Sequence, residues 1–130
     1  MRNRAPFRSE RGQSMTEFAL VLPLLVLILF SIIQFGIAFN HYISLTDAVR
    51  AGARKGAVAR QLSDPSGATI ASVRAAATDL KPSDLQISVE SSWNPGEEVI
   101  VTASYPYKIS LVGFVVRSGR MSSETVERVE

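Results

Sequence analysis

The sequence predicts an α+β fold: a long N-terminal transmembrane helix, then a short helix, then a small antiparallel sheet of three or four strands. Residues 18–39 contain no charged residue, which indicates a membrane-spanning segment. Residues 40–61 contain no proline and are rich in alanine, which favours continuation of the same helix. From residue 85 onward apolar and polar residues alternate, the pattern typical of half-buried strands.

The apolar segment 18–39 is long enough to cross a bilayer. At about 1.5 Å per residue it measures about 33 Å, against about 30 Å for a hydrocarbon core. The remaining chain is too short and too polar to enclose it as a buried helix. A secretory signal peptide is the other alternative, with Gly36-Ile37-Ala38 as its cleavage site. Such a peptide has an apolar stretch of only about 7–15 residues, so we expect a transmembrane helix and not a signal peptide. A permanent single-span anchor remains the other alternative.

Basic residues are concentrated at the N-terminus. The formal net charge is +2, and residues 1–12 contain Arg2, Arg4, Arg8 and Arg11 against Glu10. Positive charge beside a span favours the cytoplasmic side, so we expect a cytoplasmic N-terminus and an extracytoplasmic head over residues 63–130. Arg50, Arg54 and Lys55 lie on the far side and are the weaker signal. A basic tip is not a basic folded face, so we expect no nucleic-acid partner.

Residues 11–18 read Arg-Gly-Gln-Ser-Met-Thr-Glu-Phe and form the entrance to the span. Glycine allows an extended backbone to enter a protease cleft, and a carboxylate at a helix N-terminus is favoured by the macrodipole. The spacing resembles the processing site of type IV pilin-like proteins, where a membrane peptidase removes a basic leader after glycine. Cleavage after Gly12 would make Gln13 the first mature residue and Glu17 the fifth, followed by Phe18. Alone, Glu17 would be an ordinary first-turn glutamate at the lipid interface.

Residues 11–60 resemble TadE-like minor pilins, or pseudopilins, of the tight-adherence branch. Gly12 to Pro23 is similar to the opening of that family, and residues 47–54 to its post-membrane segment. Gln34-Phe35-Gly36 stands where the family often has Glu-Phe-Gly, so the charge at Gln34 is missing. The resemblance implies a structural subunit of tight-adherence pili. Its implied partners are a prepilin peptidase, other pilin-like subunits, inner-membrane pilus assembly proteins and membrane lipid.

Two groups of residues indicate helix packing. Gln34 would seek a hydrogen-bond partner in lipid, and Gly36 allows close helix approach. The alternative is that Gln34 reaches the interfacial region. Ala48, Gly52 and Gly56 recur every four residues and form a small-residue stripe. This stripe predicts packing against another helix or against the chain's own sheet, with a generic alanine-rich helix as the alternative.

The breaker cluster 63–67 is expected to end the long helix, which we place at residues 13–62. A short amphipathic helix is predicted over residues 68–80. The alternating pattern then predicts strands at 85–90 and 98–105, joined by a turn at Asn94-Pro95-Gly96. Pro106 is expected to interrupt this hairpin.

The C-terminal part contains an apolar segment and a further strand. Residues 121–129 are a third candidate strand. Residues 109–116 are apolar and we expect them to belong to the core, with a patch that touches the membrane or a partner as the alternative.

The sequence contains no catalytic motif, and we expect neither an enzyme nor a cofactor. With no cysteine and one histidine, His41, a cysteine or histidine metal site is also not expected. The predicted function is that of a structural minor pilin that is located in the inner membrane and can be incorporated into a pilus. The alternative is an uncleaved single-span membrane protein whose head binds a ligand or an envelope partner.

Overall fold

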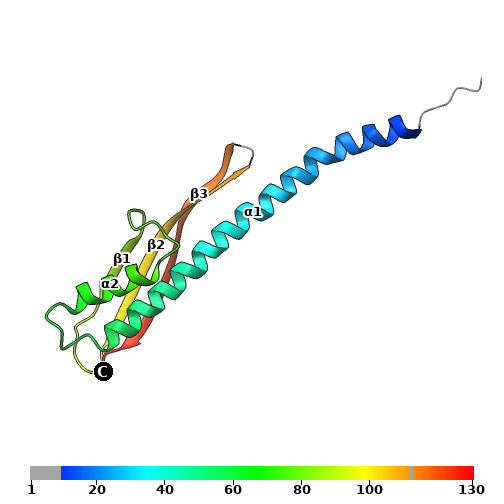
Figure 1. Cartoon of the computed structure of the whole chain (residues 1–130). Coiled ribbons are helices and arrows are strands. Elements are labelled where there is room, and N and C mark those ends of the chain that lie inside the picture. The colour runs from blue at the N-terminus through cyan, green and yellow to red at the C-terminus, as the bar shows by residue number, and fades with distance from the viewer. Residues whose placement is uncertain (1–9, 112) are drawn as a thin grey trace, which may run out of the picture.

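The computed structural model describes residues 10–111 and 113–130. Residues 1–9, which make up most of the predicted leader, therefore lie outside the described residues. The described chain folds, in sequence order, into α1 (Glu10–Ala57), α2 (Pro65–Ala76), β1 (Gln86–Glu90), β2 (Glu98–Leu111) and β3 (Phe114–Arg128). Figure 1 shows α1 as a rod whose C-terminal half lies along the sheet, while its N-terminal half extends beyond the head. The predicted α+β class is confirmed.

The long helix α1 contains the predicted span. Within the described residues, α1 alone is long and apolar enough to cross a membrane. Its residues 18–33 are all exposed in the single chain. Pro23 lies inside the helix, where the loss of one backbone hydrogen bond is tolerated near the start of a span. An exposed apolar surface of this kind has to be covered by lipid or by other chains.

The C-terminal end of α1 lies at Ala57, before the predicted end at residue 62. The backbone N–H of Ala59 donates to the carbonyl of Gly56 over 3.1 Å and tightens the last turn. The backbone N–H of Glu130 donates to the carbonyl of Ala57 over 2.9 Å. A residue from the far end of the sequence thus satisfies one of the free carbonyl groups at this helix terminus.

The second helix, α2, begins and ends earlier than the predicted range 68–80. Asp64 is its N-cap, and its Oδ1 accepts a hydrogen bond from the backbone N–H of Gly67 over 2.8 Å. Pro65 occupies the first helical position, where its missing N–H costs nothing. The cluster at residues 63–67 therefore does more than end the first helix, because it also begins the second.

The sheet is antiparallel with the order β1-β2-β3, so β2 is the central strand. β2 and β3 pair from Glu98 opposite Arg128 to Leu111 opposite Phe114. The third strand therefore begins at Phe114, well before the predicted start at residue 121.

The expectation that Pro106 interrupts the hairpin is wrong, because β2 continues to Leu111. The pairing of β2 with β1 ends at Ser104, which lies opposite Gln86, the first residue of β1. Beyond Ser104, one edge of β2 therefore has no neighbouring strand in the described chain. Proline is tolerated at such an edge because no ladder hydrogen bond has to be made there.

The core lies between the sheet and the two helices, which lie side by side over one of its faces (Figure 1). The inward-facing residues of β2 alternate with half-buried ones, which is the period of a strand covered on one face. The helices contribute mostly small and β-branched side chains. The main buried residues are Leu45, Ala48, Val49 and Ala53 of α1, Val73 of α2, and Val99, Val101, Ala103 and Tyr105 of β2.

Residues 114–116, in the second half of the apolar segment 109–116, do not form core. Phe114 is 78% exposed, Val115 62% and Val116 63%. They lie at the far end of the long β2–β3 hairpin, which Figure 1 shows leaning away from α1. For residues 114–116 the core prediction is therefore wrong, because no part of the described head covers these three side chains.

Candidate functional site

The candidate processing site lies in the first turns of α1. Gly12 and Gln13 are helical, and the carbonyl of Gly12 accepts a hydrogen bond from Thr16 Oγ1 over 2.9 Å. A protease binds its substrate as an extended strand, so this turn has to unwind before the bond after Gly12 can be cut. Glycine in a helix interior costs roughly 0.5–1 kcal/mol relative to alanine. Gly12 therefore makes this unwinding easier at the bond where it is needed.

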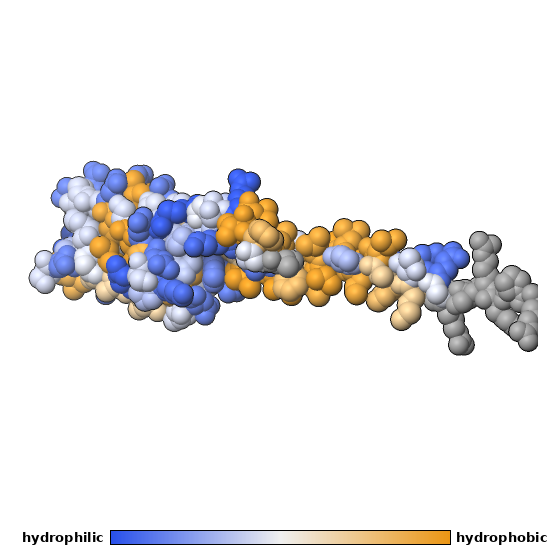
Figure 2. Space-filling view, turned by 90° about the horizontal axis from the view of Figure 1, so that it is seen from above, coloured by the Kyte–Doolittle hydropathy of each residue, from blue (hydrophilic) through white to orange (hydrophobic). Residues whose placement is uncertain are grey.

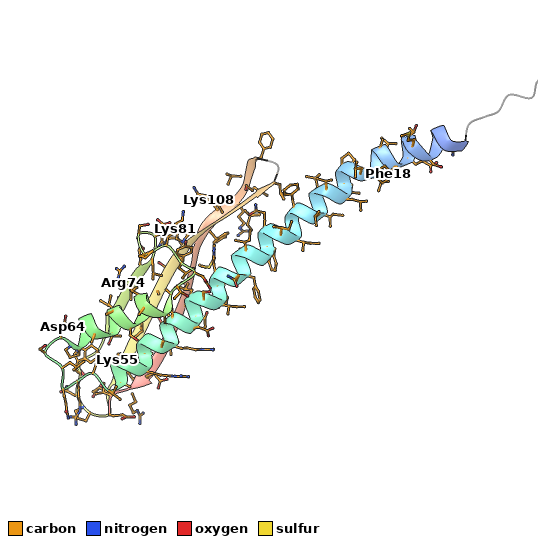
Figure 3. The ribbon with its side chains drawn as sticks, in the orientation of Figure 1. Phe18, Lys55, Asp64, Arg74, Lys81 and Lys108 are labelled. Carbon is orange, nitrogen blue, oxygen red and sulfur yellow. The ribbon has the colours of Figure 1, made fainter. Side chains whose placement is uncertain are left out.

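Glu17 lies one turn after Gln13 on the same face of α1. The side-chain N–H of Gln13 donates to Glu17 Oε1 over 3.0 Å. Both residues are exposed, and Phe18, labelled in Figure 3, follows as the first large apolar residue of the span. In the described chain, the carboxylate therefore has a neutral hydrogen-bond partner and remains open to a charged one.

The apolar surface of α1 is continuous beyond the head. Figure 2 shows it as a mainly hydrophobic rod, with one small polar patch, between the polar N-terminal turns and the head. Gln34 is half-buried, and no heavy atom lies within 4 Å of the position that a Cβ on Gly36 would take. Gly36 therefore leaves a smooth surface that is free in the single chain, and another helix has room to approach it.

The small-residue stripe lies inside the head instead. Ala48 is fully buried. A Cβ built on Gly52 would lie 2.2 Å from Val73 Cγ2, and one built on Gly56 would lie 2.8 Å from Val99 Cγ1. Of the two packing partners considered, the chain's own α2 and β2 are the ones that the structure brings against this stripe.

A second apolar surface joins α1 to the β2–β3 hairpin. A groove of about 230 Å³ lies between them, lined by Phe35, Ala38, Phe39, Tyr42, Tyr107, Ile109 and Met121. His41 packs edge-on against Tyr105 near this groove, with ring centroids 5.5 Å apart. The sequence prediction missed this groove, because its two sides lie far apart along the chain.

Among the described residues, no group of three or more histidine, cysteine, aspartate or glutamate side chains is placed to hold a metal ion. The acidic side chains of the head are instead distributed over its surface. Three features of the described chain are candidates for function. They are the turn at residues 12–17, the exposed apolar part of α1, and the exposed apolar residues 114–116 of the β2–β3 hairpin.

Comparison with known protein families gives a match for the N-terminal segment of the chain. Residues 12–54 match the family model described as TadE-like protein. This segment is TadE-like. The match begins at Gly12 and covers Gln13, Glu17 and the whole span, so it confirms the resemblance given by the sequence. No curated protein and no solved structure matches the chain significantly.

The TadE-like match associates the chain with Tad pili, and the family is structural rather than enzymatic. The long apolar helix indicates a membrane-anchored protein. Residues 55–130, which include both α2 and the sheet, lie outside the matched range. The described head therefore adds information that the family comparison does not contain.

Proposed function

We propose that this chain is a structural minor pilin, or pseudopilin, that takes part in the assembly of tight-adherence pili after a prepilin peptidase removes residues 1–12. The observation that carries the proposal is the position of the TadE-like match, which starts at the glycine of the predicted cleavage site. Glu17 then follows at the fifth mature position, at the entrance to an exposed apolar helix. The chain would reside in the inner membrane with its N-terminus in the cytoplasm and its head outside.

The exposed apolar surface of α1 also provides a physical reason for the subunits to assemble. Subunits packed side by side would cover the apolar surface of residues 18–39 with one another instead of lipid. Such packing would enclose Glu17, and a carboxylate in an apolar bundle is costly unless it is paired. Cleavage creates an α-amino group at Gln13, which can pair with Glu17 of a neighbouring subunit. The partners would be the peptidase, other pilin-like subunits and inner-membrane assembly proteins.

The processing step is tested by the mass of the membrane-extracted protein from cells that contain the peptidase. We expect a species that begins at Gln13, and we expect Gly12→Ala to accumulate the full-length chain. Gly36→Ala is the matched control, because it makes the same change in the same helix, away from the junction. An intact Met1 terminus in the unsubstituted protein would contradict the proposal and favour an uncleaved single-span protein whose head binds a ligand or envelope partner.

The assembly step is tested separately with substitutions at Glu17. Glu17→Gln keeps a group that can hydrogen-bond to Gln13 but removes the charge, whereas Glu17→Ala removes both. We expect both variants to be cleaved and both to be depleted from sheared pili, because the α-amino group needs a charged partner. Normal incorporation of Glu17→Gln would show that the charge is dispensable and that hydrogen bonding alone is sufficient.

A further inference from the structure

The end of the β2–β3 hairpin is apolar on both of its faces. Successive residues of a strand point to opposite faces, yet Phe114, Val115 and Val116 are consecutive and all exposed. A sheet that covers a core on one side needs apolar residues on that side alone. The segment 109–116 also contains no charged residue. An end of this kind requires an apolar environment that surrounds it.

Contacts between α1 and β2 show which part of α1 the end of the hairpin lies beside. Val99 lies against Gly56, and Tyr105 lies against His41. The two elements therefore run in opposite directions, with about 20 Å of strand matching about 22 Å of helix. The groove agrees with this alignment, because Phe35 of α1 and Ile109 of β2 both line it.

The same spacing places Leu111 up to about 20 Å beyond Tyr105, which corresponds to about 13 residues of helix. The end of the hairpin is thus level with the region around Ile28 at the deepest, and less deep because it leans away from α1 (Figure 1). Residues 18–39 form the predicted span. A bilayer that encloses the span must therefore also meet the end of the hairpin.

The charges beside the apolar end suit a bilayer surface. Lys108 and Arg117 are exposed and lie on adjacent strands just before this end (Figure 3 labels Lys108). By the strand register, Arg120 lies on the same face of the hairpin as Lys108, and Arg117 lies on the opposite face. Arg120 is held by a hydrogen bond to the carbonyl of Ser104 over 3.1 Å. No acidic residue occurs between Tyr105 and Glu124. Long basic side chains can keep their charge at the lipid phosphates while their stems lie in the apolar region.

We propose that the β2–β3 hairpin is a second membrane-inserting element, whose end, at residues 111 and 113–116, enters the acyl region of the leaflet that faces the head. Lys108 and Arg117 bind anionic lipid phosphates, and the groove beside Phe35 and Ile109 holds acyl chain. This inference rests on the membrane anchoring that is part of the proposed function. It differs from that function because it assigns a lipid contact to the head itself.

Lipid is the occupant that the described contacts favour. The level of the hairpin end is set within one chain, so it meets the bilayer before any subunit joins. A basic margin next to an uncharged end also follows the order of phosphate and acyl chain in a leaflet. A second copy of the chain could cover the hairpin end only if it placed an apolar surface at the same depth in the bilayer.

The experiment uses the full-length chain, which contains no native cysteine. An environment-sensitive fluorophore is attached at Phe114→Cys, at Ile28→Cys in the span, or at Val126→Cys near the other end of β3. Val126 is a matched control because it is an exposed apolar residue of the same strand. Each protein is reconstituted in vesicles of phosphatidylethanolamine and phosphatidylglycerol. Quenching is measured with acyl-chain spin-labelled lipid and with iodide present on both sides.

We expect the spin-labelled lipid to quench the probes at Phe114 and Ile28 several-fold more than the probe at Val126, and iodide to show the reverse order. Val116→Cys repeats the measurement in case the first variant is poorly folded. In vesicles without anionic lipid, or with Lys108→Gln and Arg117→Gln combined, lipid quenching at Phe114 should fall while quenching at Ile28 stays the same.

Three outcomes would overturn the inference. A Phe114 probe that behaves like the Val126 probe lies in water. A Phe114 probe protected from both quenchers is covered by protein, which would make a second copy of the chain the occupant. If the probe at Ile28 is not quenched by lipid either, the span itself is wrong, and the membrane anchoring fails together with the lipid contact of the hairpin.

Discussion

Substitution of Gly52 by alanine tests how closely α1 and α2 approach each other. The added Cβ would lie 2.2 Å from Val73 Cγ2, whereas carbon atoms in contact are separated by about 3.5–4.0 Å. Val73 is fully buried and β-branched, and such a side chain has one strongly preferred rotamer in a helix. Its methyl group therefore cannot rotate away, and the two helices have to separate by more than about 1 Å.

The size of the effect follows from two opposing terms. Overpacking a core costs about 1–3 kcal/mol. Replacement of glycine by alanine in a helix gains about 0.5–1 kcal/mol. Because the clash is severe and its partner is rigid, we expect a net loss of about 1–2 kcal/mol in the free energy of unfolding of the head. For a domain of this size that loss lowers Tm by roughly 5–10 °C.

The fluorescence of Trp93 provides the assay, since it is the single tryptophan of the chain and packs against the core of the head. Thermal unfolding is followed in detergent micelles with the full-length protein. Gly36→Ala is the control, because its Cβ meets nothing within 4 Å, and it should leave the Tm of the head unchanged. In a Val73→Ala background, Gly52→Ala should cost less than it does alone. A Gly52→Ala protein as stable as the unsubstituted chain would refute the close approach.

Further predictions concern single residues of the head and use the same unfolding assay unless another is named. Leu45→Ala removes a fully buried side chain of α1 and should cost about 2–5 kcal/mol; a loss below 1 kcal/mol would contradict its place in the core. Asp64→Ala removes the N-cap acceptor of α2 and should cost about 1 kcal/mol, whereas Asp64→Asn should retain most of the stability. Pro106→Val should leave Tm nearly unchanged but increase self-association, measured by light scattering, because it adds an N–H to an open strand edge; unchanged scattering would show that the edge is otherwise protected.

The presence of the helices and strands could be predicted, because it depends on patterns in neighbouring residues. The residues at which they begin and end could not, because these depend on contacts with distant parts of the chain. The span and the alternating strands follow from patterns within short segments. The end of α1 is fixed partly by the amide of Glu130, which no pattern near Ala57 reveals. The first half of β3 was missed because Phe114, Val115 and Val116 do not alternate with polar residues.

The same distinction applies to the candidate site. Gly12, Gln13 and Glu17 are close in sequence, so their spacing was sufficient to indicate a processing site. The groove between α1 and the hairpin joins Phe35 to Ile109 and could not be inferred from either segment alone. A usable signal was nevertheless present for the hairpin end, because residues 111–116 contain no polar side chain and so lack the alternation of a strand buried on one face.

The alignment of α1 with β2 and β3 also determines how the head responds to mechanical load. A force that pulls on the anchored half of α1 acts parallel to its interface with the two long strands (Figure 1). The contacts at Leu45, Val49, Ala53 and Ala57 are then sheared together instead of being opened one after another. The hydrogen bond from Glu130 to Ala57 joins the far end of the sheet to the far end of the helix. A head built this way resists extraction along the axis on which the helix is pulled.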